Sequence, residues 1–284
     1  MARMDCTVRT MHRHEVPLAI DWAAQEGWNP GLHDAACFHA ADPGGFLIAE
    51  VGGHPVGCVS AVSYAGRFGF IGLYIVAPAW RGQGIGLRLW NAAMSRLSGQ
   101  VVGLDGVPAQ QANYRRGGFM LAWNNARMSG VAGPNPEGAS RRIVRLTDVD
   151  FATLCRKDRS VFPAPRDAFL RAWSTMPDST GLAWLDNGEL RGWGVVRQCR
   201  QGHKIGPLVA DTPAIASALF GALGDALPAG DAVFLDVPMP NRNAIALAEA
   251  NGMRSVFDTA RMYTYPAPEC KLETVYGITT FELG

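Results

Sequence analysis

Arg81-Gly-Gln-Gly-Ile-Gly86 follows an apolar stretch at 70–76 and directly precedes a segment of helical appearance at 87–94. Three glycines in six residues let backbone N–H groups turn toward one point without Cβ clashes. The N-terminus of the following helix adds about half a positive charge aimed at the same point. Arg81 supplies a further fixed cation. The strand, loop and helix together predict a phosphate-binding site.

Length, charge and cysteine usage limit the class of protein. A chain of 284 residues suits two domains of about 140 residues each. A net charge of +1 argues against nucleic acid or a membrane surface as partner. There is no apolar run of about 18 residues, and the first 25 residues lack an export signal. Six scattered cysteines without C-x-x-C spacing suit a reducing compartment. We therefore expect a cytoplasmic protein with a small ligand.

The chain contains an internal duplication. Residues 118–128 read GFMLAWNNARM and residues 252–262 read GMRSVFDTARM, an offset of 134. Repeats of this length are domains rather than solenoid units. A stretch rich in glycine and proline at 130–140 reads as a linker. The sequence predicts an N-terminal domain at 1–132, a linker at 133–140 and a C-terminal domain at 141–284.

Strands and helices alternate in each copy. This alternation predicts an α/β or α+β fold with a mixed sheet. The pattern at 275–283 predicts a further strand that adds to a sheet. In the first copy we expect a strand near 6–10, helices across 14–40, a hairpin at 46–63 turning at Gly52-Gly53, a strand at 67–76, a helix at 84–97, a strand at 101–105, a helix at 109–117 and strands across 119–130.

With Asn113-Tyr-Arg-Arg-Gly-Gly-Phe119, the strand and loop resemble the GNAT superfamily of N-acetyltransferases over residues 1–130. Segments at 26–31, 42–46, 104–107 and 281–284 further resemble a bacterial two-domain subgroup over essentially the whole chain. The resemblance implies tandem GNAT folds, each a mixed, mostly antiparallel sheet flanked by helices. It also implies a splayed strand pair between 72–76 and 101–105, and acetyl-coenzyme A as co-substrate.

The resemblance assigns roles residue by residue. Tyr114 would hydrogen-bond or protonate the thioester sulfur, because its spacing to Gly118-Phe119 matches the family motif. The backbone at 74–76 would pair with the pantetheine, and an N–H at or near Val76 would polarise the thioester carbonyl. The implied coenzyme-binding residues are Tyr74, Ile75, Val76, Arg81, Gly82, Gln83, Gly84, Ile85, Gly86 and Asn113.

The general base is left open by the sequence. Direct acyl transfer needs a neutral amine, donors to the thioester oxygen and a proton for the thiolate. The strand at 67–76 carries no Glu, Asp or His, although many relatives place a carboxylate there. Glu26, Asp34 and Asp105 are the candidates, and each could equally cap a helix or satisfy a turn.

Aromatic and histidine residues complete the candidate set. Trp22, Trp28, Phe38 and Phe46 could line an acceptor pocket or belong to the core. His12 and His14 lack a third ligand, so we predict no metal site.

The second copy has lost the chemistry of the first. The offset of 134 maps Arg81 to Ile215, Gly84 to Ala218 and Tyr114 to Ala248. We therefore expect one coenzyme per chain, in the N-terminal half. The second copy would serve as a structural partner or as one wall of the acceptor site. Lys204 and Asp236 are the polar residues of the second copy that are candidates to line a cleft between the halves.

These observations favour one function over two others. We expect an acetyl-CoA-dependent N-acyltransferase that moves an acetyl or short acyl group directly to a primary amine of a small molecule. One alternative is an acyl-CoA-binding regulator or scaffold without turnover. The other is an enzyme that acetylates a protein or peptide N-terminus. A homodimer is compatible with the sequence.

Overall fold

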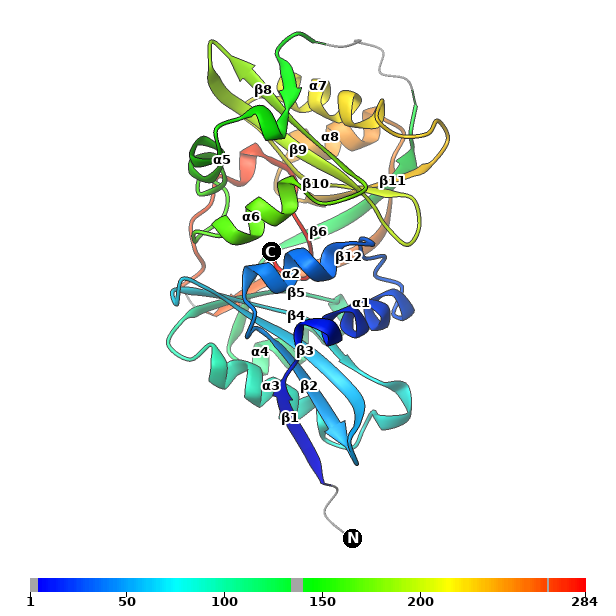
Figure 1. Ribbon diagram of the computed structural model, residues 1–284, viewed down its shortest axis with the longest axis vertical. Helices are drawn as coiled ribbons and strands as arrows, with labels where there is room; N and C mark the ends of the chain where they lie inside the picture. Colours follow the sequence, from blue (N-terminus) through cyan, green and yellow to red (C-terminus); the bar gives the residue numbers. More distant parts are fainter. Residues whose placement is uncertain (1–4, 134–139, 265) are drawn as a thin grey trace.

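The computed structural model describes residues 5–133, 140–264 and 266–284. Its strands form one 13-stranded sheet (Figure 1). The strand order is β1-β2-β3-β4-β5-β12-β6-β11-β10-β9-β8-β7, and β13 pairs with β10 beside this path. Within the described residues, β4–β5 and β10–β11 are the parallel pairs and the other ladders are antiparallel. The expected mixed, mostly antiparallel sheet is confirmed.

The first half follows the expected order of elements. Gly52 and Gly53 both have positive φ, 58° and 77°, and form the tight turn between β2 and β3. Ile85, Leu89 and Ala93 recur along one face of α3 and bury it against the sheet. The elements are β1 (Cys6–Thr10), η1 (Arg13–Glu15), α1 (Val16–Gln25), α2 (Asp34–Ala41), β2 (Phe46–Val51), β3 (His54–Tyr64), β4 (Phe68–Val76), η2 (Pro78–Trp80), α3 (Ile85–Arg96), β5 (Val101–Gly106), η3 (Pro108–Gln110), α4 (Gln111–Arg116) and β6 (Phe119–Val131).

The second half repeats this order, as the duplication predicts. The C-terminal strand is shorter than expected, because β13 ends at Gly277 while the prediction ran to 283. The elements are β7 (Ile143–Arg145), η4 (Leu146–Asp148), α5 (Phe151–Asp158), α6 (Asp167–Ser174), β8 (Ser179–Asp186), β9 (Glu189–Gln198), β10 (His203–Ala210), α7 (Pro213–Gly224), β11 (Ala232–Pro238), α8 (Arg242–Ala250), β12 (Arg254–Thr264), η5 (Leu272–Thr274) and β13 (Val275–Gly277).

The two halves exchange their last long strands. β12 lies between β5 and β6, and β6 lies between β12 and β11. Residues 260–263 pair with 103–106 of the first half, and residues 125–131 pair with 232–238 of the second. Each half therefore completes its sheet with a strand from the other. The boundary predicted at 133–140 stays a prediction, because residues 134–139 lie outside the described part of the chain.

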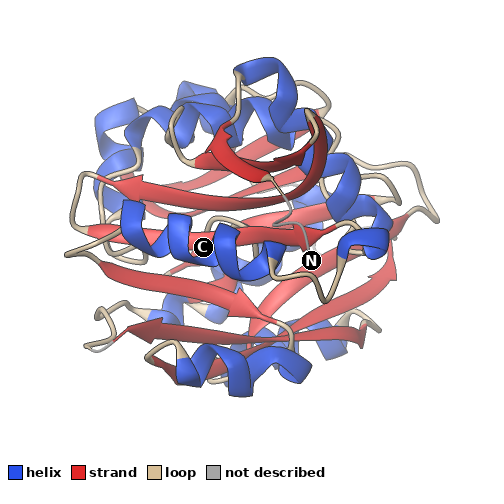
Figure 2. Cartoon of the chain, turned by 90° about the horizontal axis from the view of Figure 1, so that it is seen from below, coloured by secondary structure: helices blue, strands red, loops and turns tan. Residues whose placement is uncertain are grey.

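Helices cover both faces of the sheet (Figure 2). On the inner face, α1 and α2 meet α5 and α6 in a core shared by both halves, in which Phe38 and Trp173 stack at 6.4 Å. Figure 1 shows α2 and α6 facing each other near the C-terminus. On the outer face, α3 covers the first half and α7 and α8 cover the second. This arrangement leaves the end of β4 and the start of α3 beside the junction of the halves.

Candidate active site

The strands β4 and β5 separate at the point where the sequence predicts a splay. They pair in parallel from Phe68 to Ile71, and the ladder ends there. Across β3, two residues of β4 oppose Val59, and Leu73 has a φ of 45°. Such a bulge bends the strand and turns it from its neighbour. The edge of β4 beyond Ile71 thus faces an opening rather than another strand.

The glycine loop forms an anion cradle at the N-terminus of α3. Gly82 and Gly84 have φ values of 77° and 80°, which L side chains rarely adopt. A Cβ on Gly86 would lie 2.8 Å from Tyr74 Oη, so this glycine permits a close approach. The first helical bond of α3 runs from Arg88 N to Gly84 O. Within the described residues, the amides of 82–86 have no backbone acceptor and remain available to an anion.

Other predicted loop residues have structural partners. Arg81 Nε donates to Val76 O at 2.8 Å, and its Nη2 pairs with Glu26. Gln83 Nε2 donates to Ala79 O at 3.1 Å. Ile85 is the first residue of α3 and its side chain is buried in the core, so only its backbone is available to the loop. These contacts hold the loop against the end of β4.

A groove runs from the glycine loop into the opening between β4 and β5. It has about 1160 Å³ of open space. A second pocket of about 500 Å³ shares Trp28, Tyr74, Asp105, Val107 and Tyr114 with it. The groove is lined by Glu26, Trp28, Tyr74, Ile75, Val76, Trp80, Arg81, Gly82, Gly86, Asp105, Val107, Gln110 and Tyr114. We call the first space the coenzyme groove and the second the inner pocket. The structure thus brings together most of the predicted site residues.

Tyr114 lies where the two spaces meet. Its ring packs on Gly106, where a Cβ would lie 2.3 Å from Cε2, and beside Trp90 with ring centroids 5.8 Å apart. Burial, with a smaller effect of Tyr74, raises the pKa of Tyr114 to about 12. The hydroxyl therefore keeps its proton at neutral pH and can give it to a developing anion.

The three predicted base candidates all have cationic partners. Glu26 pairs with Arg81 at the groove. Asp105 accepts from Arg261 at 2.7 and 2.6 Å, and burial still raises the pKa of its carboxyl group. Asp34 is fully buried and does not line either space. It accepts from Arg197 at 2.8 Å and from Gly31 N at 2.7 Å.

Several predicted residues lie away from the groove. Asn113 is exposed on α4 and bonds to Gln110 and Arg116. Phe38 and Phe46 belong to the inner core, and Trp22 packs against it. Lys204 and Asp236 are buried at the contact between the halves, where Lys204 donates to Asn29 O and Asp236 accepts from Arg127.

Phe281 and Glu282 also line the inner pocket, although neither was predicted from the sequence as a site residue. Residues 278–284 are buried and form a tail beyond β13, so the strand predicted across 275–283 is wrong beyond Gly277. A Cβ on Gly72 would lie 2.1 Å from Glu282 O. The glycine at 72 was the local signal that another segment approaches this strand, but it did not identify which one.

The second half has no equivalent opening. β10 pairs with β11 only across 203–205 in the described chain, and β13 then pairs with β10 at Leu208 and Val209. The offset of 134 places these two residues at Tyr74 and Ile75. Thr212 Oγ1 accepts from Ile215 N and caps α7. The chain's own strand and cap thus occupy the positions where the first half has a groove and free amides.

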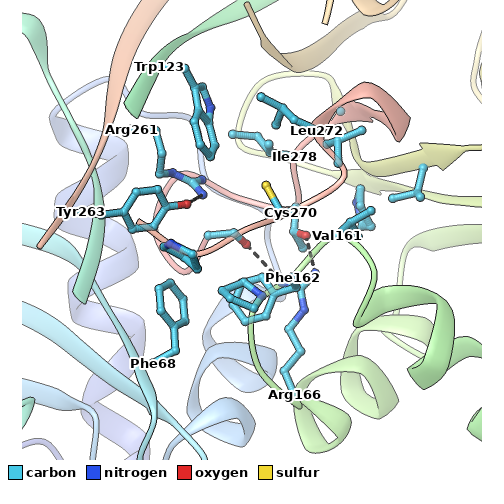
Figure 3. A pocket seen from close by; sticks show the side chains of 18 residues that line it. Phe68, Trp123, Val161, Phe162, Arg166, Arg261, Tyr263, Cys270, Leu272 and Ile278 are labelled. Carbon is cyan, nitrogen blue, oxygen red and sulfur yellow. Dashed lines mark hydrogen bonds between the residues drawn. The ribbon is translucent and has the colours of Figure 1, made fainter. Parts of the chain in front are cut away.

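A third pocket lies beside the C-terminus and carries no acidic lining residue (Figure 3). Arg166 donates to Thr279 Oγ1 and Gly284 O, and it pairs with Asp158 at 2.8 Å. Arg261 is paired with Asp105, and burial raises the pKa of the Cys270 thiol. Both arginines of this pocket are therefore paired, and its thiol keeps its proton at neutral pH.

The described residues form neither a metal site nor a membrane-spanning helix. No three His, Cys, Asp or Glu side chains in the described chain come together to hold a metal ion. His12 and His14 stack on each other at 5.6 Å. Among the helices that the structure describes, none is long and apolar enough to cross a membrane.

Comparisons with known proteins match this architecture. The family model described as "Acetyltransferase (GNAT) family" matches residues 11–119, and the one described as "Acetyltransferase (GNAT) domain" matches 154–277. The chain is 30% identical over 270 residues to holothin acyltransferase of Pseudoalteromonas sp. (strain SANK 73390), covering 95% of this chain and 92% of that protein.

Solved structures show the same fold. A putative acetyltransferase from Pyrococcus horikoshii has a TM-score of 0.84 at 20% identity and covers 100% of this chain and 98% of its own. A tandem GNAT protein from the clavulanic acid biosynthesis pathway has a TM-score of 0.65 at 13% identity and covers 93% of this chain and 100% of its own.

The fold and the groove define a tandem GNAT protein. The chain belongs to the GNAT acetyltransferase family and is an acyltransferase. Members of this family generally use an acyl-CoA as co-substrate.

Proposed function

We propose that the protein is an acetyl-CoA-dependent N-acyltransferase that moves an acetyl or short acyl group directly to a primary amine of a small molecule. The observation that carries this proposal is one continuous set of lining residues. It runs from the loop amides at 82–86 along the open edge of β4 to the Tyr114 hydroxyl.

The residues present fit an acyl-CoA. The free amides and the positive end of α3 suit a pyrophosphate. The unpaired edge of β4 at 72–76 suits a pantetheine added as a further strand. When bound, the coenzyme supplies the acyl group as a thioester. Tyr114 keeps its proton at neutral pH and lines both spaces, which supports a role for it in protonating the departing sulfur.

The inner pocket supports a small acceptor rather than a protein terminus. Its walls come from both halves, because Phe257 and Thr259 of β12 and Phe281 and Glu282 of the tail face Trp28 and Tyr74. The relative named holothin acyltransferase supports the same conclusion, since its name gives a single compound as acceptor.

Thiol release from acetyl-CoA tests the proposal. The purified protein is incubated with acetyl-CoA and with each member of a panel of primary amines, and separately with holothin. We expect Tyr114→Phe to lower kcat by about 10²-fold, the lower end for general acid catalysis. Arg81→Ala should raise the KM for acetyl-CoA. Coenzyme binding without thiol release on any amine would refute the proposed N-acyltransferase activity. It would favour the alternative of an acyl-CoA-binding regulator. Unchanged rates in both variants would refute the assignment of the active site to this groove.

A further inference from the structure

We propose that Glu282, carried by the C-terminal tail of the second half, is the base that accepts the proton of the acceptor amine. This role rests on the proposed function. The nitrogen–carbon bond forms as the carbon–sulfur bond breaks. The amine proton passes to Glu282, and Tyr114 gives its proton to the thiolate. Exchange with solvent then restores both groups, so atoms and charges balance.

Three carboxylates line the coenzyme groove and the inner pocket: Glu26, Asp105 and Glu282. Glu26 is paired with Arg81. Both oxygens of Asp105 accept hydrogen bonds, Oδ1 from Arg261 and Asn125 and Oδ2 from Arg261. Within the described chain, the Glu282 side chain has no hydrogen bond and no cation within 4.0 Å. Glu282 is therefore the carboxylate of the pocket whose oxygens are free to receive a proton.

The fold fixes Glu282 at the apex of the opening. The β4–β5 ladder ends at Ile71, and the backbone of Glu282 packs directly on the next residue, Gly72. Tyr64 Oη donates to Leu283 O at 3.0 Å, and Leu283 N donates to Thr280 Oγ1 at 2.9 Å. These bonds anchor the tail on the residue after Glu282. The backbone that carries Glu282 is thus held by structure rather than left on a free end.

The electrostatic surroundings suit a base. Glu282 is 3% exposed, and this burial raises the pKa of its carboxyl group. Lys204 of β10, Arg127 of β6 and Arg197 of β9 oppose the shift, whereas Asp34 of α2 adds to it. Asp105, Tyr74 and Tyr114 are the other titratable groups that line the pocket. A carboxyl group with a raised pKa holds an amine proton better than an exposed one.

The position of Glu282 also explains why the first half can lack a carboxylate on its own strand beside the opening. The strand at 67–76 carries no Glu, Asp or His. The tail brings Glu282 to the same strand from 210 residues further along the chain, because the backbone of Glu282 contacts Gly72. The second half thereby contributes a reacting group to the chemistry of the first.

Glu282→Gln tests the role because it keeps the size of the side chain and removes its ability to accept a proton. The matched control is Glu273→Gln, which changes an exposed carboxylate of the same C-terminal region that lines neither space. We measure kcat and kcat/KM from pH 5 to 9, the Kd for acetyl-CoA, and Tm. In Glu282→Gln, kcat should fall about 10²-fold or more and the acid limb of the pH profile should disappear. Coenzyme Kd should stay within about twofold, and Glu282→Asp should restore part of the rate.

The outcomes separate this role from the proposed function. Wild-type turnover with an unimpaired Glu282→Gln variant overturns the role alone. Absence of wild-type turnover with coenzyme bound overturns the proposed function and, with it, the role. A loss of rate accompanied by a lower Tm and weaker coenzyme binding would mark Glu282 as structural, and would also overturn the role.

Discussion

Replacing Gly72 with Ala should displace the C-terminal tail. The added Cβ would lie 2.1 Å from Glu282 O, 2.8 Å from its carbonyl carbon and 2.9 Å from its Cα. The tail would have to retreat by about 1.3 Å to restore a contact of 3.4 Å. All three atoms are backbone, so no side-chain rotation can relieve the contact. Overpacking of this kind costs about 1–3 kcal/mol, and a displacement of about 1 Å at a reacting group costs about 10²-fold in rate.

Gly69→Ala is the matched control in the same strand. Its Cβ would meet the two methyl carbons of Leu97 at 2.8 Å, and a flexible side chain can move aside. Urea unfolding and thiol-release kinetics are measured for both variants. We expect Gly72→Ala to lose stability and kcat while it still binds acetyl-CoA, and Gly69→Ala to lose less of both. A Gly72→Ala variant with wild-type kcat would refute the argument that the tail must lie against this strand.

Three further predictions address the loop, a buried ion pair and the tail. Gly84→Ala should weaken acetyl-CoA binding in calorimetry, whereas Gly99→Ala, which has the same φ of 80° in a turn after α3, should carry only the backbone cost of about 1–2 kcal/mol. Asp34→Asn should lower the free energy of unfolding by about 3 kcal/mol, because it leaves Arg197 buried without its charge partner, and a denaturant midpoint equal to wild type would contradict this. The raised pKa of Glu282 means that wild-type stability falls as pH rises from the unfolded pKa through the folded one. The Tm of Glu282→Gln relative to wild type should therefore increase between pH 4.5 and 8, and a constant difference would argue against the shift.

The coenzyme groove could be predicted because its signals are local. The loop at 81–86 has its own backbone requirement, and the spacing from Tyr114 to Phe119 lies within one short helix and its turn. The base could not be predicted in the same way. Asp34 and Asp105 find Arg197 and Arg261 only after folding, 163 and 156 residues away in sequence, and Glu282 reaches its pocket through the tail. No periodic pattern encodes such contacts.

The exchange of β6 and β12 between the halves could not be predicted from the sequence, for a different reason. Residues 118–128 and 252–262 are copies with the same apolar spacing, so either strand satisfies the burial pattern beside β5 or β11. A sequence pattern can assign these residues to strands, but two equivalent strands compete for two equivalent positions. The chain places β12 beside β5 and β6 beside β11, and the pattern alone does not distinguish this arrangement from its opposite.

The pairing of β13 with β10 has a consequence for the whole chain. The same short C-terminal segment fills the opening of the second half and then delivers Glu282 to the first. Restoring the glycine loop at 215–220 would therefore not create a second coenzyme site, because Val275 and Gly277 would still hold the edge of β10. Removing that segment to free the edge would withdraw Glu282 from the inner pocket. The C-terminal segment therefore supplies Glu282 to the pocket of the first half while its strand β13 fills the opening of the second half.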